Sequence, residues 1–78
     1  DYTTVIRLNP TDASAYFYRG IAYAKVGRRM EALRNLREAA QLFQNQGDTS
    51  GYQQTLSTLK SLHKSMILET PEPSIASK

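Results

Sequence analysis

Apolar residues recur at helical spacing in four separate segments of the chain. In residues 1–8 they are Tyr2, Val5, Ile6 and Leu8. The Asn9-Pro10 pair ends this run, because a residue before proline avoids the helical region. Residues 13–26 follow, with Asp12 placed to cap their first turn. This second segment is apolar most of the way round, which predicts a helix covered on more than one side.

The third and fourth segments carry stripes of different width. The stripe of residues 29–44 is broad, with Leu33, Leu36, Ala40 and Phe43 at its centre and Met30, Ala32 and Ala39 widening it. The fourth helix, capped by Asp48, Thr49 or Ser50 and running to about Leu68, has the narrow stripe Tyr52, Leu56, Leu59, Leu62 and Met66. A narrow stripe predicts a helix with only one side to bury. The very short links between helices predict antiparallel neighbours. We therefore predict an all-α fold of four helices arranged as antiparallel hairpins.

Two glycines mark special positions in the second segment. Gly20 lies inside the predicted helix, where glycine costs about 1 kcal/mol relative to alanine. We expect another helix to approach closely at Gly20. Gly27 is expected to supply the positive φ that ends the helix.

Composition narrows the classes of function. The chain has 78 residues and no cysteine, which allows one small domain with neither disulfide nor thiolate metal site. No run is long and apolar enough to span a membrane. We expect a cytoplasmic location, with a periplasmic one left open.

The sequence offers no recognisable catalytic group. His63 is the only histidine, and no carboxylate stands at helical spacing beside it. The glycines form no phosphate-binding loop. Glu31 and Glu38 are best explained as solvated charges beside Arg34. We expect no catalytic site, no metal site and no cofactor.

The spacing of the large and small residues resembles the tetratricopeptide repeat, a helical hairpin with a period of 34 residues. The positions that carry the resemblance are Tyr16, Gly20, Tyr23, Ala32, Leu36 and Ala39. Residues 13–46 resemble one complete repeat, and residues 1–12 resemble the end of a preceding one. We interpret residues 47–68 as a capping helix and residues 69–78 as a disordered tail, so the chain resembles the C-terminal end of a repeat array.

A repetition within the chain supports the resemblance, and two positions depart from it. Tyr2 and Val5 stand one period before Leu36 and Ala39. Arg19 replaces the leucine that is usual before the glycine. Gln44 stands where the family has its closing proline.

The resemblance implies a protein–protein interaction module of the scaffold or adaptor kind. In the family, the first helix of each pair lines a concave surface. By resemblance, the positions of this groove are Ser14, Phe17, Ile21, Ala24 and Lys25. The subfamily that clamps carboxylate tails has basic and amide side chains where this chain has Phe17 and Ile21, so we do not expect that activity.

Two alternatives remain from the sequence. The groove and the uncovered part of residues 1–8 favour a homo-oligomer, such as a symmetric dimer. The basic helix face consists of Arg28, Arg29, Arg34 and Arg37. It would suit an acidic partner or a nucleic acid, although we expect a solvated face there and do not expect nucleic acid as the partner.

Overall fold

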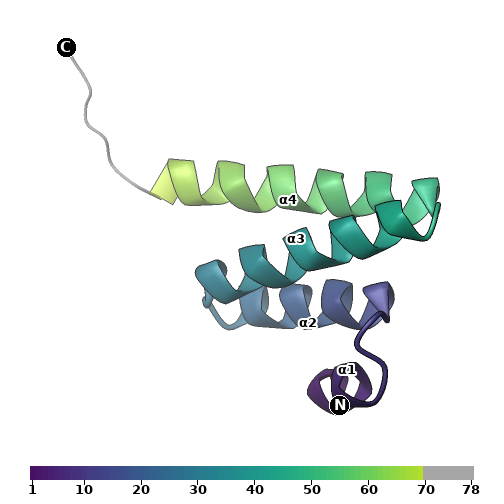
Figure 1. The fold of residues 1–78 in the computed structure, drawn as a ribbon. Coiled ribbons are helices and arrows are strands. Elements are labelled where there is room, and N and C mark those ends of the chain that lie inside the picture. Colours follow the sequence, from purple (N-terminus) through teal and green to yellow (C-terminus); the bar gives the residue numbers. More distant parts are fainter. Residues whose placement is uncertain (70–78) are drawn as a thin grey trace.

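The computed structural model describes residues 1–69, with side chains placed for residues 1–64. It contains the helices α1 (Tyr2–Leu8), α2 (Ala13–Lys25), α3 (Arg29–Asn45) and α4 (Thr49–Glu69), and no strand occurs within this range. Helices α2, α3 and α4 run antiparallel to their neighbours in the chain, whereas α1 crosses below α2 and is seen end-on (Figure 1). The four-helix, all-α fold predicted from the sequence is confirmed.

Short polar side chains begin three of the helices. Asp1 accepts a hydrogen bond from the Thr3 amide at 2.8 Å. Asp12 accepts one from the Ala15 amide at 3.0 Å. Asp48 is the residue that caps α4, because its Oδ1 accepts from the Gly51 amide at 2.9 Å. These carboxylates satisfy amides that have no partner inside the helix, and they lie at the positive end of its dipole.

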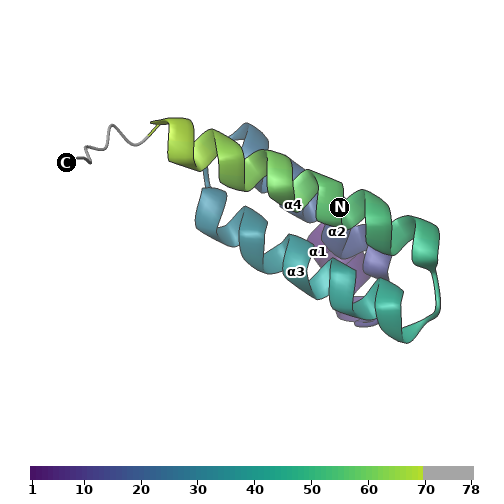
Figure 2. The same cartoon turned by 90° about the horizontal axis from the view of Figure 1, so that it is seen from above.

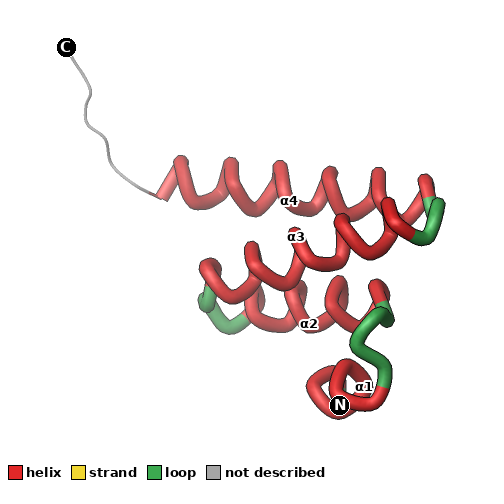
Figure 3. The backbone as a smooth tube through the Cα atoms, viewed as in Figure 1, coloured by secondary structure: helices red, strands yellow, loops and turns green. Residues whose placement is uncertain are grey.

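The two inter-helix turns end their helices in the same way. Gly27 has a φ of 84° and Gly47 a φ of 73°, a conformation that glycine adopts without steric cost. The Arg28 amide donates to the Tyr23 carbonyl at 2.9 Å, and the Asp48 amide donates to the Phe43 carbonyl at 2.9 Å. This bond across the helix end is typical of a Schellman motif. It reverses the chain within the short green loops of Figure 3, so that successive helices lie antiparallel.

The core lies where α2, α3 and α4 meet. Its central buried residues are Ala13, Phe17, Leu36, Ala39, Leu42 and Phe43. Helix α3 contributes most of them because it is contacted by α2 on one side and by α4 on another. Seen from above, α4 and α3 lie along each other over much of their length (Figure 2). Met30, which the sequence placed on the buried stripe of α3, is 60% exposed.

Two glycines set the spacing of the helices. A Cβ added at Gly20 would lie 2.9 Å from Leu36 Cγ and 3.2 Å from the Ala32 carbonyl oxygen. The expected close approach at Gly20 is therefore present, between α2 and α3. A second one was missed: a Cβ at Gly51 would lie 2.5 Å from a ring carbon of Phe43. Thr55, one turn after Gly51, is fully buried and donates to the Gly51 carbonyl at 2.8 Å.

Helix α4 therefore makes close contact with α3 through the small residues Gly51 and Thr55, which lie outside the apolar stripe predicted from the sequence. Tyr52, Leu56, Leu59 and Leu62 are only half-buried. Helix α4 extends to Glu69. The remainder of the predicted tail, residues 70–78, lies outside the described part of the chain.

Candidate functional site

The predicted groove positions lie on one side of α2, because their spacing follows the helix period. Their exposure differs from one end to the other. Ser14 and Lys25 are exposed, while Ile21 and Ala24 are half-buried. Helix α4 contacts α2 much less than it contacts α3, so this side of α2 is only partly covered.

Phe17 differs from the other groove positions. It is 7% exposed and belongs to the core cluster with Leu42 and Phe43. Its ring also meets Tyr18 edge-on, with centroids 5.3 Å apart. Phe17 is therefore a packing residue, and the accessible apolar surface of the groove centres on Ile21.

The family-signature residues divide into a buried set and a half-buried set. Ala32, Leu36 and Ala39 are fully buried, and the first two lie against Gly20. Tyr16 and Tyr23 are half-buried and line an open hollow of about 450 Å³ between α2 and α3. The tyrosines therefore border solvent on one side.

A polar network at this hollow was not recognised from the sequence. Arg19 Nε donates to Asn35 Oδ1 at 2.7 Å, and Asn35 Nδ2 donates to the Glu31 carbonyl at 2.7 Å. Asn35 is 7% exposed, so its amide is buried with both ends bonded. The available signal was a polar residue inside the apolar stripe of α3, one turn from Ala32 and Ala39.

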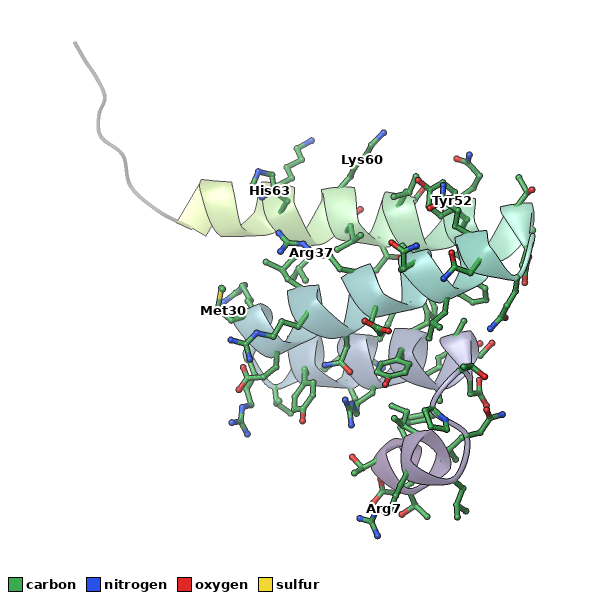
Figure 4. All side chains as sticks on the ribbon, viewed as in Figure 1. Arg7, Met30, Arg37, Tyr52, Lys60 and His63 are labelled. Atoms are coloured by element: carbon green, nitrogen blue, oxygen red, sulfur yellow. The ribbon has the colours of Figure 1, made fainter. Side chains whose placement is uncertain are left out.

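The structure places the four arginines of the predicted basic face in different surroundings. Arg28 forms an ion pair with Glu31 at 3.1 Å, and its Cζ lies 5.7 Å from the centroid of the Tyr23 ring. Arg34 lines the α2–α3 hollow. Arg37 is exposed elsewhere on α3 (Figure 4). Arg29 is half-exposed at the start of that helix. An ion pair between two exposed side chains contributes little, about 0–1 kcal/mol.

Neither a metal-binding cluster nor a membrane-spanning helix occurs in the part of the chain that the structure describes. There, no three histidine, cysteine or acidic side chains gather closely enough to hold a metal ion. None of the described helices combines the length and the apolar character needed to cross a bilayer. His63 is exposed on α4 (Figure 4).

Fold and surface together define a helical-repeat protein, in which antiparallel hairpins pack side by side and leave a partly covered apolar helix side. The family model described as the tetratricopeptide repeat matches residues 1–34, from α1 into α3. This match supports the assignment of residues 1–34 to the tetratricopeptide repeat family, in agreement with the sequence resemblance. No curated protein and no solved structure matches the chain significantly.

The matched window begins earlier than the unit predicted over residues 13–46, although each spans one period of 34 residues. The boundaries of the repeat unit remain a prediction. Repeats of this family are generally protein–protein interaction modules and are typically non-catalytic.

Proposed function

We propose that the chain binds a segment of another protein on the side of α2 that carries Ile21 and Ala24. The observation that carries the proposal is the half-buried apolar side chain of Ile21 on a helix side that α4 covers only in part. Covering the remaining apolar surface is favourable by about 25 cal/mol per Å². Ser14 and Lys25, both exposed, form the polar edges of this surface.

The chemistry of these residues suits a partner segment with one apolar anchor. The anchor side chain packs on Ile21 and Ala24, and the half-buried Leu59 and Leu62 of α4 lie against the same core cluster. Lys25 favours an acidic group beside that anchor, through a contact that salt weakens. An amphipathic or extended segment laid on a helical surface in this way is a common mode of peptide recognition.

Ile21→Glu is the variant that tests this surface. Phe17→Glu is unsuitable, because a charge at a buried core position unfolds the domain instead of probing a contact. Peptides selected from a random library on the wild-type chain should lose at least about tenfold in affinity for Ile21→Glu, about 1.4 kcal/mol. Gln53→Glu, which adds the same charge at an exposed site on α4, should bind them normally. Equal binding by Ile21→Glu would refute the proposal.

Self-association is the second candidate function, and a specific observation favours it. Tyr2 is 44% exposed and Tyr18 50% exposed, with their rings stacked at a centroid distance of 5.9 Å. Val26, which follows the last residue of α2, is 70% exposed. A two-fold dimer that buries this surface would dissociate on Tyr18→Glu. Sedimentation of the wild-type chain as a monomer at micromolar concentration would exclude it.

A further inference from the structure

Arg19 occupies a prepared position at the junction of three helices. Its Nε donates to the buried Asn35 of α3, and its NH1 donates to Thr3 Oγ1 of α1 at 3.4 Å. Its Cζ lies 5.6 Å from the centroid of the Tyr16 ring, within the range of a cation–π contact. These contacts orient the guanidinium before any ligand arrives, which lowers the entropy lost on binding.

Two hollows meet at this guanidinium. The hollow between α2 and α3 is polar, and Arg34 and Asn35 line it together with the tyrosines. A second hollow of about 440 Å³ lies between α1 and α2, lined mainly by apolar atoms of Tyr2, Ala22 and Val26, with Asp1 and Thr3 at its α1 side. Arg19 and Tyr23 border both hollows. A fixed cation thus stands beside an open apolar surface.

Three acidic residues, Asp1, Glu31 and Glu38, line the two hollows, but none of them is paired with Arg19 within the described residues. No carboxylate in residues 1–64 forms an ion pair with it. Of the two acidic residues at the α2–α3 hollow, Glu31 is already paired with Arg28 at 3.1 Å. Glu38 lines the same hollow as Arg34 and forms no ion pair with Arg19. An arginine has five N–H donors, and these contacts use two of them.

We propose that Arg19 binds an aspartate or glutamate side chain of a partner protein, while the next apolar side chain of that segment enters the α1–α2 hollow. The planar guanidinium matches a carboxylate by two parallel hydrogen bonds, and charge-assisted bonds of this kind are about twice as strong as neutral ones. The apolar hollow adds burial that a small free anion cannot provide. The preferred ligand is therefore an acidic residue followed by a branched or aromatic one.

This site is separate from the surface of the proposed function. At 100° per residue, Arg19 and Ile21 point to opposite sides of α2, with the Gly20 contact to α3 between them. The leucine usual in the family at the position of Arg19 could not bind a carboxylate. The inference therefore rests on a position at which this chain departs from the usual residue of the family.

An NMR titration with short capped peptides tests the site. The probe peptide contains a central Glu-Leu pair between glycine and serine residues, and its control contains Gln-Leu. The Glu-Leu peptide should shift the Arg19 Nε–H signal and the amides of Thr3, Ala22 and Tyr23 saturably. The Gln-Leu peptide should bind at least about tenfold more weakly, because it lacks the charge. Raising the salt concentration should weaken only the Glu-Leu complex, since salt screens exposed charges.

Three variants make the test specific. Arg19→Leu should abolish the shifts, whereas Arg37→Leu, which removes the same charge from an exposed site on α3, should bind as the wild type does. Arg19→Leu also leaves Asn35 Oδ1 without its donor and can unfold the domain. Arg19→Lys keeps the charge but loses the planar pair of donors, and it should bind several-fold more weakly while circular dichroism shows a folded chain.

Several results of these titrations would overturn the proposal. Equal binding of the two peptides, or equal loss in Arg37→Leu, would show a general charge effect and overturn the proposal. Shifts centred on Ile21 would place the peptide on the other surface. A wild-type dimer with the amides of Tyr2, Tyr18 and Val26 at its interface would show that a second copy fills the hollow. If Ile21→Glu bound the library-selected peptides as tightly as the wild type, the proposed function would fail, but the Arg19 site would not be affected.

Discussion

Replacing Gly20 by alanine sets two effects of opposite sign against each other. Alanine is the better helix former, which by itself stabilises α2 by about 1 kcal/mol. The added Cβ would lie 2.9 Å from Leu36 Cγ and 3.2 Å from the Ala32 carbonyl oxygen. Neither neighbour can move easily, because Leu36 is fully buried and the carbonyl belongs to the backbone of α3. The α2–α3 contact must therefore widen.

Overpacking of this kind costs about 1–3 kcal/mol, occasionally more. The cost exceeds the gain in helix propensity, so we expect Gly20→Ala to lower the free energy of unfolding by about 1–2 kcal/mol. For a domain of this size, each kcal/mol shifts the melting temperature by about 4–8 °C. Urea unfolding followed by far-UV circular dichroism measures the difference directly.

Ala22→Gly provides the matched control. Ala22 is exposed two residues after Gly20 on the same helix, so its replacement reports the propensity difference without a steric contribution. It should cost about 1 kcal/mol. Subtracting this propensity from the Gly20→Ala result isolates the steric cost at the helix contact. If Gly20→Ala proves more stable than the wild type by the full propensity difference, α2 and α3 do not meet closely at Gly20, and the packing described here is wrong.

Three further changes rank the contributions to stability, each measured by the same urea titration. Leu36→Ala should remove about 2–5 kcal/mol by leaving a cavity at the centre of the core, so its urea midpoint should fall close to zero in a domain of marginal stability. Asp48→Ala should cost about 1 kcal/mol because it removes the cap of α4, and Asp48→Asn, which keeps the accepting oxygen, should recover most of it. Tyr16→Ala should cost clearly less than Leu36→Ala, because its half-buried ring borders an open hollow that water can enter; an equal loss would contradict the burial described here.

The helix boundaries could be predicted because local signals determine them. Pro10 and Asp12 end one helix and begin the next, and Gly27 supplies the conformation that the following reversal requires. The broad stripe of α3 identified Leu36 and Ala39 as buried for the same reason. Each of these inferences depends on residues within a few positions of one another.

The packing of α4 could not be predicted in the same way. Its closest contacts to α3 use Gly51 and Thr55, which an apolar pattern ignores. Small residues at a spacing of four were the available signal, because they let two helices approach. The burial of Phe17 also depends on where α3 and α4 lie, and no local pattern fixes that.

The Arg19 network was beyond sequence reasoning because its members are distant in the chain. Arg19 is separated by sixteen positions from both Thr3 and Asn35. An arginine in place of the family leucine showed that something differed at this position. Only the geometry shows that the guanidinium donates to the buried amide of Asn35 on α3 and to the hydroxyl of Thr3 on α1.

The two proposed surfaces of α2 are physically linked through the contact at Gly20. Arg19 and Asn35 flank that contact, and their hydrogen bond is 2.7 Å long, so a wider separation of α2 and α3 must lengthen or break it. Ile21 follows Gly20 directly and moves with the same helix. Gly20→Ala should therefore weaken carboxylate binding at Arg19 even under conditions where the variant remains folded, whereas Asp48→Ala, which loosens only the start of α4, should leave that binding unchanged. Identical peptide affinities in the two variants would show that the Arg19 site does not depend on the close approach of the helices.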